Sequence, residues 1–109
     1  MKLKTLRERA FVRQQGRCYY CSARMWQISP EELGLHRKSS RLLQCTAEHL
    51  IARRDGGGDT CDNIVAACHY CNWLRHARRN AALAPEVYAA RVRKRVARGT
   101  WHAPFAIFE

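Results

Sequence analysis

The apolar residues near the beginning of the chain recur at the spacing of an α-helix. Between Leu3 and Gln15, four of them fall on one helical face: Leu3, Leu6, Ala10 and Phe11. Basic residues separate them, and Gly16 follows as a typical helix end. The pattern therefore predicts a basic amphipathic helix at the start of the chain.

Shorter patterns follow in the middle of the chain. Residues 29–30, a Ser-Pro pair before two glutamates, are typical of the start of a helix, which Gly34 keeps short. The apolar residues within 41–49 favour a first strand. The run 63–67 favours a second strand or an extended lead-in to a helix. Residues 55–59 contain three consecutive glycines, which lose too much backbone freedom in a regular element, so we expect a loop.

Two helices complete the pattern. We expect one at about 70–80 and another that begins near Pro85 and ends at Gly99. Valine and alanine recur loosely at helical spacing in the second helix, and basic residues fill its remaining face. The tail from Trp101 to Phe108 is aromatic, and we expect it to pack back on the domain. Helices combined with two strands predict an α+β fold.

The composition fits one small globular domain. The chain has 109 residues, of which 47% are hydrophobic and 27% are charged, close to globular averages. A core of this size leaves stability marginal, and small domains often add a metal or a disulfide. Six cysteines in the sequence predict such a crosslink.

The net charge narrows the choice of partner. The chain has 20 Lys and Arg against 9 Asp and Glu, which gives a net charge of +11 and a pI of about 10.1. This excess predicts attraction to a polyanion, either nucleic acid or an anionic membrane surface. No apolar run reaches the roughly 20 residues of a membrane span, and the basic N-terminus lacks an apolar signal region. We therefore expect a cytoplasmic protein with no membrane partner, in which thiols stay reduced.

Four cysteines have the spacing of a zinc site. Cys18 and Cys21 form one CxxC pair, and Cys68 and Cys71 form another. Two such pairs predict a structural zinc ion with four thiolate ligands, and four buried free thiols are the alternative. The other two cysteines lack CxxC partners, so we expect small core residues at Cys45 and Cys61. Because four cysteines already complete the set, His69 is not expected to bind the ion.

The segments between and after these pairs carry a further order of residues. Cys45-Thr-Ala-Glu-His-Leu-Ile51 comes first, then Asp55-Gly-Gly-Gly-Asp-Thr60, then Asp62-Asn-Ile-Val65, and finally Cys68-His-Tyr-Cys-Asn72. This order resembles that of HNH endonucleases of the zinc-containing, four-cysteine type. The resemblance runs from Cys18 to about Arg75. It implies one HNH nuclease domain over 1–109, with a zinc-stapled ββα-metal (His-Me finger) core at about 18–80 and basic flanking helices at about 3–16 and 85–98.

The resemblance also implies roles for individual residues. His49 corresponds to the general base that activates water, and Glu48 to the acidic metal ligand beside it. Asn72 corresponds to a second metal ligand, and Asn63 to the residue that braces the loop and orients the base. The family's catalytic metal is then Mg²⁺ or Mn²⁺, or another divalent transition metal, because amide and carboxylate oxygens are hard donors. Adjacent strand residues point to opposite faces, so the strand is expected to end or bend at Glu48 and His49.

Other residues extend this set. His76 lies four residues after Asn72, and we expect a third metal ligand, a phosphate contact or a plain surface histidine there. Arginines near the motif are expected to contact nucleic acid: Arg53, Arg54, Arg75, Arg78 and Arg79. Two positions depart from the family pattern. Glu48 stands where Asp is more usual, and Ala52 where proline commonly occurs.

Two classes of function follow from these residues. The first is a metal-dependent DNA endonuclease that nicks or cuts both strands with low intrinsic sequence specificity. It fits a bacterial or phage-encoded protein that acts with a phage-packaging or mobile-element partner. The second is a zinc-stabilised DNA-binding module without catalysis, which would need no acidic residue beside its histidine. A weaker alternative is an RNA-binding zinc knuckle that stacks bases on aromatic residues: Tyr19, Tyr20, Trp26 or Trp73.

Overall fold

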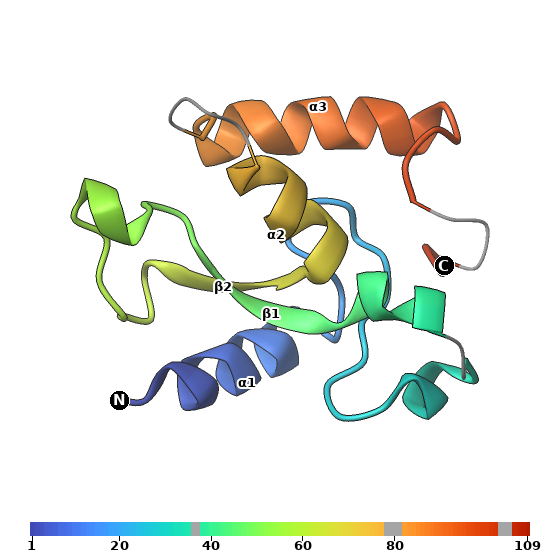
Figure 1. The fold of residues 1–109 in the computed structure, drawn as a ribbon, viewed down its shortest axis with the longest axis horizontal. Coiled ribbons are helices and arrows are strands. Elements are labelled where there is room, and N and C mark those ends of the chain that lie inside the picture. Colours follow the sequence, from blue (N-terminus) through green and yellow to red (C-terminus); the bar gives the residue numbers. More distant parts are fainter. Residues whose placement is uncertain (36–37, 78–81, 103–105) are drawn as a thin grey trace.

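The computed structural model describes residues 1–35, 38–77, 82–102 and 106–109 (Figure 1). Three α-helices and two strands form its frame: α1 Leu3–Arg13, β1 Cys45–His49, β2 Ile64–Cys68, α2 His69–His76 and α3 Pro85–Ala97. Three short 3₁₀ helices lie in the connections: η1 Pro30–Leu33, η2 Lys38–Leu43 and η3 Arg53–Asp55. The α+β fold class is therefore confirmed.

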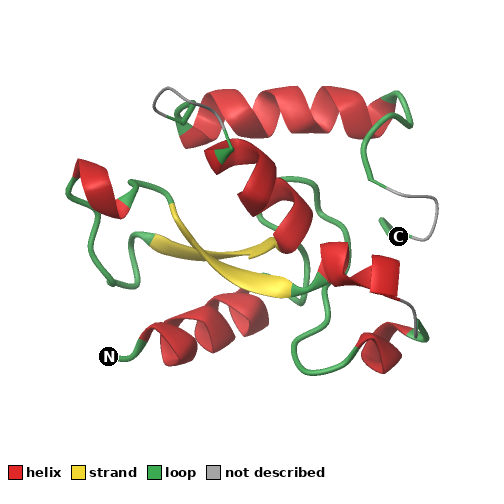
Figure 2. Cartoon of the chain, viewed as in Figure 1, coloured by secondary structure: helices red, strands yellow, loops and turns green. Residues whose placement is uncertain are grey.

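The two strands pair in antiparallel fashion between layers of helix. Cys45 pairs with Cys68 at one end of the ladder, and His49 pairs with Ile64 at the other. In Figure 1, α1 packs against one face of the sheet and α2 against the other, with α3 beyond α2. β2 is buried along its whole length, which explains why it reads as a continuous apolar run. The same layers are visible by element type in Figure 2.

The first strand is shorter than the sequence predicts. Residues 41–43 belong to η2, and β1 begins only at Cys45. Leu43 is fully buried from this 3₁₀ turn, and the backbone N–H of Trp26 donates to its carbonyl oxygen. A short apolar run has no periodicity that separates a strand from a tight helical turn, so the sequence prediction was wrong there.

The other predicted elements are present with small shifts at their ends. Ser29 caps η1 in a capping box with Glu32, and Gly34 ends that helix in the left-handed conformation. α1 ends at Arg13, before Gln15 and Gly16, which both have positive φ. α2 ends at His76, earlier than expected, and residues 78–80 of the expected helix lie outside the described residues.

The aromatic tail returns to the domain, as the sequence predicts. Trp101 packs edge-on against Tyr70 at 5.0 Å between ring centroids, and Phe108 contacts the core cluster. The N–H of Arg24 donates to the carbonyl oxygen of Ile107 at 2.7 Å. The tail therefore covers the side of the molecule that carries the two cysteine pairs. No helix in the described part of the chain is both long and apolar enough to span a membrane.

Asn63 holds together the loop between the strands. Its side-chain Oδ1 accepts from the N–H of Ile51 at 2.8 Å, and its Nδ2 donates to the carbonyl oxygens of Ile51 and Gly58 at 3.0 and 3.1 Å. Gly57 passes so close to this clamp that a Cβ there would overlap the Ile51 carbonyl and approach Asn63 Nδ2 at 2.8 Å. The loop conformation therefore requires glycine at position 57.

This close approach predicts a difference between neighbouring glycines. Gly57→Ala should lower the free energy of unfolding by about 2 kcal/mol or more, because the Cβ collides with backbone. Gly58→Ala is the matched control, since its nearest contact is Thr60 Cγ2 at 3.9 Å and should leave stability nearly unchanged. Urea unfolding of both variants measures the difference. Equal effects would contradict the clamp.

Candidate active site and metal centre

The four cysteines of the two CxxC pairs converge on one point. Cys18 and Cys21 lie in the turn after α1, Cys68 ends β2, and Cys71 lies in the first turn of α2. Their sulfur atoms all lie within 4.8 Å of one another, and all four residues are buried. Backbone N–H groups of Tyr20 and Cys68 point at Cys18 Sγ at 3.4 and 3.3 Å. Four thiolates in this arrangement are the donor set of a structural zinc ion.

The electrostatics of this cluster call for a cation. Burial raises the pKa of Cys68 and of Cys71 well above the usual value for a thiol. Hydrogen bonds from the neighbouring cysteines, that of Cys18 foremost, lower the pKa of Cys21. Four thiolates cannot coexist in a buried space without a compensating positive charge. A divalent ion supplies that charge, so the residues fit a bound metal.

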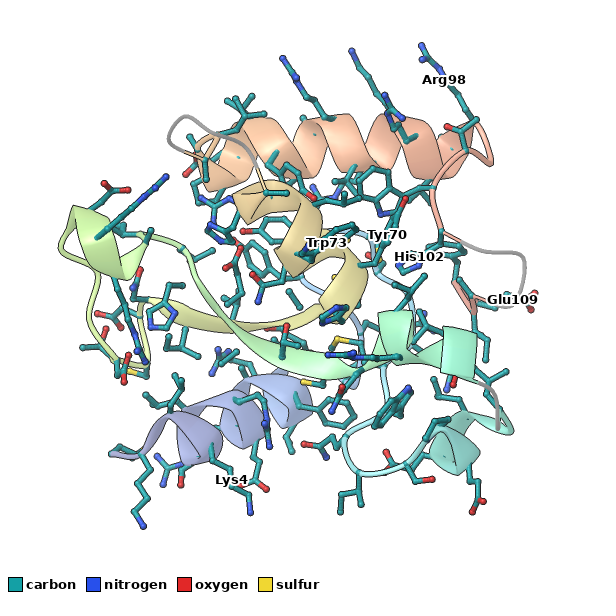
Figure 3. All side chains as sticks on the ribbon, viewed as in Figure 1. Lys4, Tyr70, Trp73, Arg98, His102 and Glu109 are labelled. Atoms are coloured by element: carbon teal, nitrogen blue, oxygen red, sulfur yellow. The ribbon has the colours of Figure 1, made fainter. Side chains whose placement is uncertain are left out.

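Two tail residues also contact the sulfur atoms. Trp101 Nε1 donates to Cys71 Sγ at 3.3 Å, and His102 Nε2 lies 3.3 Å from Cys68 Sγ. In Figure 3, His102 lies beside Tyr70, with which it stacks at 4.6 Å. The sequence gives no signal for these contacts, because a histidine 31 residues after Cys71 has no ligand spacing. N–H donors of this kind commonly orient metal ligands.

The two remaining cysteines differ in burial. Cys45 is buried, as the sequence predicts, and burial raises its pKa to about 12. Cys61 is exposed, so the prediction of a core residue was wrong there. Cys61 follows a glycine-rich loop with no apolar periodicity, and the loop carries it to the surface. His69 does not belong to the metal-binding group found among the described residues.

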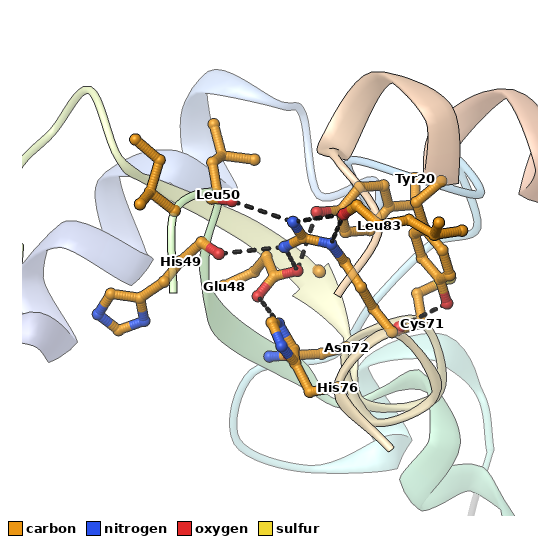
Figure 4. A network of polar contacts seen from close by, with 12 residues as sticks. Tyr20, Glu48, His49, Leu50, Cys71, Asn72, His76 and Leu83 are labelled. Carbon is orange, nitrogen blue, oxygen red and sulfur yellow. Dashed lines mark hydrogen bonds and ion pairs between the residues drawn. The ribbon is translucent and has the colours of Figure 1, made fainter. Parts of the chain in front are cut away.

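Glu48 is the centre of a buried polar network (Figure 4). Its side chain is 1% exposed. Oε2 accepts from Tyr20 Oη and from Arg75 Nη1, both at 2.9 Å, and Oε1 lies 2.9 Å from His76 Nε2. A buried carboxylate needs such partners to remain charged. Burial and the nearby Glu48 charge raise the pKa of Tyr20 far above its usual range, so Tyr20 stays protonated and donates.

Arg75 lies inside the domain rather than on its surface. It is 4% exposed, and its guanidinium donates to Glu48 and to the carbonyl oxygens of His49, Leu50 and Leu83. These acceptors turn the whole guanidinium inward. The arrangement contradicts the expected phosphate contact, and Arg75 instead joins β1, α2 and the start of α3. The sequence could not distinguish these roles, because a basic residue near a nuclease motif fits both.

Asn72 and His76 lie one turn apart on α2, on the side that faces Glu48 (Figure 4). Asn72 Nδ2 donates to Thr46 Oγ1 at 3.0 Å and to the Ala47 carbonyl at 3.2 Å, which leaves Oδ1 as the acceptor. Glu48 Oε1 and His76 Nε2 are in hydrogen-bond contact at 2.9 Å. By donor type, a carboxylate, an amide and an imidazole are groups that a divalent metal accepts.

His49 points away from this group, as expected for the next residue of a strand. β1 ends at His49. His49 Nε2 lies 2.8 Å from Asp59 Oδ1 and 3.2 Å from Arg53 Nε. The hydrogen bond with His49 lowers the pKa of Asp59, and Arg53 acts in the same direction. The sequence did not indicate Asp59, because acidic residues in glycine-rich loops are common.

The remaining expected contacts lie on the surface or outside the described residues. Arg53 and Arg54 are exposed in η3, whereas Arg78 and Arg79 lie outside the described residues. Of the four aromatic residues considered for base stacking, Tyr20 and Trp26 are buried and Tyr19 is partly exposed. Trp73, next to Asn72, is 57% exposed. An RNA-binding surface of several stacked aromatics is therefore not formed by these residues.

The cysteine cluster predicts a metal-dependent fold. The purified protein should contain about one zinc ion per chain by elemental analysis. Its removal by a chelator should unfold the domain, because structural zinc contributes roughly 10 kcal/mol or more to the folding of small domains. Cys71→Ser should abolish stoichiometric zinc, whereas Cys61→Ser, outside the cluster, should leave zinc content and stability unchanged. A folded, metal-free protein would contradict this prediction.

Comparison with known protein families gives a match for part of the chain. Residues 31–78 match the family model described as HNH endonuclease. No curated protein and no solved structure matches the chain. The matched segment includes Glu48, His49, Asn63, Asn72 and His76, together with the second cysteine pair, while Cys18, Tyr20 and Cys21 lie before it. The chain therefore carries an HNH endonuclease domain at residues 31–78.

Proposed function

We propose that this protein is a metal-dependent DNA endonuclease that hydrolyses phosphodiester bonds. One observation carries the proposal above the others. The end of β1 places a buried carboxylate, Glu48, beside Asn72 and His76 on one side, and it places His49 on the other. A domain that only bound DNA would need no acidic residue beside its histidine. An HNH endonuclease domain supports the same reading.

Glu48, Asn72 and His76 would hold the catalytic metal. Their hard oxygen donors and one imidazole suit Mg²⁺ or Mn²⁺, and other divalent transition metals also accept this set. When bound, such an ion neutralises charge that develops on the phosphate and on the leaving oxygen. The protein's own contribution is to hold the Glu48 carboxylate in a fixed orientation. Arg75 and Tyr20 occupy Oε2, so Oε1 stays directed toward His76.

His49 would take the proton of the attacking water. The water oxygen forms a bond to phosphorus while the bond to the leaving oxygen breaks, and the electron pair of that bond stays on the leaving oxygen. The water's proton moves to the imidazole, and the leaving oxygen takes a proton from solvent. Asn63 supports this role from the backbone, because its carbonyl accepts from the N–H of Leu50, the residue after His49, at 2.9 Å.

The charge distribution supports nucleic acid as the substrate and suggests how it is approached. Arg53 lies beside His49, and Arg54 follows it as an exposed residue of η3 in the loop after β1, where both can meet phosphates. The basic helices α1 and α3 lie on opposite sides of the domain, as Lys4 and Arg98 show in Figure 3. One duplex therefore meets one of these helices at a time. Contacts made through charge alone predict low sequence specificity.

Plasmid cleavage by site variants tests the proposal. His49→Ala should lower the rate of Mg²⁺- or Mn²⁺-dependent cleavage by roughly 10²-fold or more, the usual contribution of a positioned base, while zinc content stays unchanged. Asn72→Ala and His76→Ala should instead raise the metal concentration needed for half-maximal cleavage, because they remove ligands. Asn63→Ala should be intermediate, since it disturbs only the loop. Relaxed circles report nicking, and linear plasmid reports double-strand cleavage.

Trp73→Ala serves as the control for the helix-α2 variants, because Trp73 is exposed between the two ligand positions. It should keep the metal dependence of the unaltered protein. Cleavage unchanged in His49→Ala would overturn the nuclease proposal and indicate a contaminating enzyme. Absence of cleavage by the unaltered protein across Mg²⁺, Mn²⁺, Co²⁺ and Ni²⁺, with DNA binding retained, would establish the non-catalytic binding module instead.

Salt dependence tests the mode of binding. If about five phosphates are contacted, the log–log slope of duplex affinity against salt should be roughly −4 to −5. Removing three charges in and just before α1 (Lys2→Gln, Lys4→Gln, Arg9→Gln) or three near the end of α3 (Arg93→Gln, Lys94→Gln, Arg98→Gln) should have unequal effects, because the helices lie on opposite sides. Binding titrations on the His49→Ala protein measure both. A flat salt response would contradict a phosphate-binding surface.

A further inference from the structure

The loop between the strands brings an acidic residue to the histidine of the proposed active site. Asp59 Oδ1 lies 2.8 Å from His49 Nε2. Arg53 Nη2 donates to both carboxylate oxygens of Asp59 at 3.3 Å, and Arg53 Nε lies 3.2 Å from the same His49 nitrogen. The His49 side chain is 14% exposed and that of Asp59 is 38% exposed. The contact therefore sits at the edge of the site, partly shielded from water.

These contacts determine which ring nitrogen of His49 carries the proton. Nε2 cannot donate to Asp59 and accept from Arg53 at the same time. An ionised carboxylate only accepts, and the hydrogen bond with His49 together with Arg53 keeps the pKa of Asp59 below its usual value. The contact with Asp59 is also the shorter of the two. We therefore assign the proton to Nε2, and Nδ1 has no hydrogen-bond partner among the described residues.

The loop itself is held so that this contact persists. Asn63 Nδ2 donates to the carbonyl oxygen of Gly58, the residue before Asp59. The Asn63 carbonyl accepts from the N–H of Leu50, the residue after His49. One residue thus anchors the backbone on both sides of the His49–Asp59 pair. This differs from an exposed surface ion pair, whose long side chains are free to separate.

We propose that Asp59 is a positioning residue for His49, which holds the proton on Nε2 and keeps Nδ1 free to accept the proton of the attacking water. The inference rests on the proposed nuclease function. When the water's proton reaches Nδ1, the imidazole becomes a cation, and the Asp59 carboxylate stabilises that charge without taking the proton itself. A carboxylate that orients a histidine base works in this way in hydrolases of other folds. Asp59 also accepts hydrogen bonds from Arg53, and this contact holds Arg53 beside the same histidine.

Nuclear magnetic resonance of the histidine ring nitrogens tests the contact without any activity measurement. In the full-length protein labelled with ¹⁵N-histidine, the His49 signals are identified by their loss in His49→Gln. The unaltered protein should show the proton on Nε2. In Asp59→Ala, Arg53 Nε can donate to Nε2, so the proton should shift toward Nδ1. Asp55→Ala, in the same loop, is the matched control and should leave the spectrum unchanged.

Cleavage kinetics test the consequence. Asp59→Asn should lower the single-turnover rate by about 10-fold or more, though by no more than His49→Ala. DNA affinity and the metal concentration for half-maximal rate should stay within about twofold, which a general disturbance of structure would not produce. Asp59→Glu, which keeps the carboxylate, should recover part of the rate.

The outcomes separate this inference from the proposed function. A proton on Nδ1 in the unaltered protein, or an Asp59→Ala spectrum identical to it, would overturn the role of Asp59 whether or not the protein cleaves DNA. Equal cleavage rates for Asp59→Asn and the unaltered protein would do the same. An unaltered protein that fails to cleave, but shows the expected proton shift, would overturn the nuclease proposal and leave the His49–Asp59 pairing established.

Discussion

The buried ion pair between Glu48 and Arg75 is the interaction on which the rest of the site depends. It joins the end of β1 to α2 at 2.9 Å, with both side chains almost fully buried. The other donors of Arg75 reach the carbonyl oxygens of His49, Leu50 and Leu83, so one side chain ties a strand end, a loop and the approach to α3. Removing one partner of such a pair leaves an uncompensated charge, which typically costs about 3 to 5 kcal/mol. The pair therefore joins the strand to the helix and gives the buried Glu48 carboxylate a cationic partner.

The alternation of a β-strand organises the chemistry around this joint. Glu48 and His49 are neighbours in the chain, but their side chains leave the strand on opposite sides. Glu48 meets Asn72 and His76 on α2, whereas His49 meets Asp59 and Arg53 in the loop. The strand end thus separates the proposed metal ligands from the proposed general base. Glu48 and His49 are consecutive residues of the same strand. The hydrogen bonds that Asn63 makes to the loop and Arg75 makes to the strand end therefore position both side chains together.

The cysteine cluster performs a different task at the other end of the same strands. Cys45 and Cys68 are register partners, so the sheet begins beside the four sulfur atoms and ends at His49. The cluster joins the turn after α1 to β2 and α2, and Trp101 and His102 extend it to the tail. A two-stranded sheet is marginally stable alone. Helices on both faces and a metal-binding cluster at one end add the stability that the few strand residues cannot provide.

The sequence by itself determined the elements and much of the site. Helical periodicity located α1 and α3, the CxxC pairs located the metal cluster, and the order of Glu48, His49, Asn63 and Asn72 indicated an HNH domain. These features are local or depend on spacing along the chain, so no knowledge of distant contacts is needed. Only the tertiary structure decided that Arg75 is buried, that Cys61 is exposed, that residues 41–43 form a 3₁₀ turn, and that Asp59 and His102 reach His49 and Cys68. Each of these outcomes depends on contacts between residues that are separated in the sequence and meet only when the chain folds. Neither the type of a side chain nor its spacing along the chain predicts such a contact.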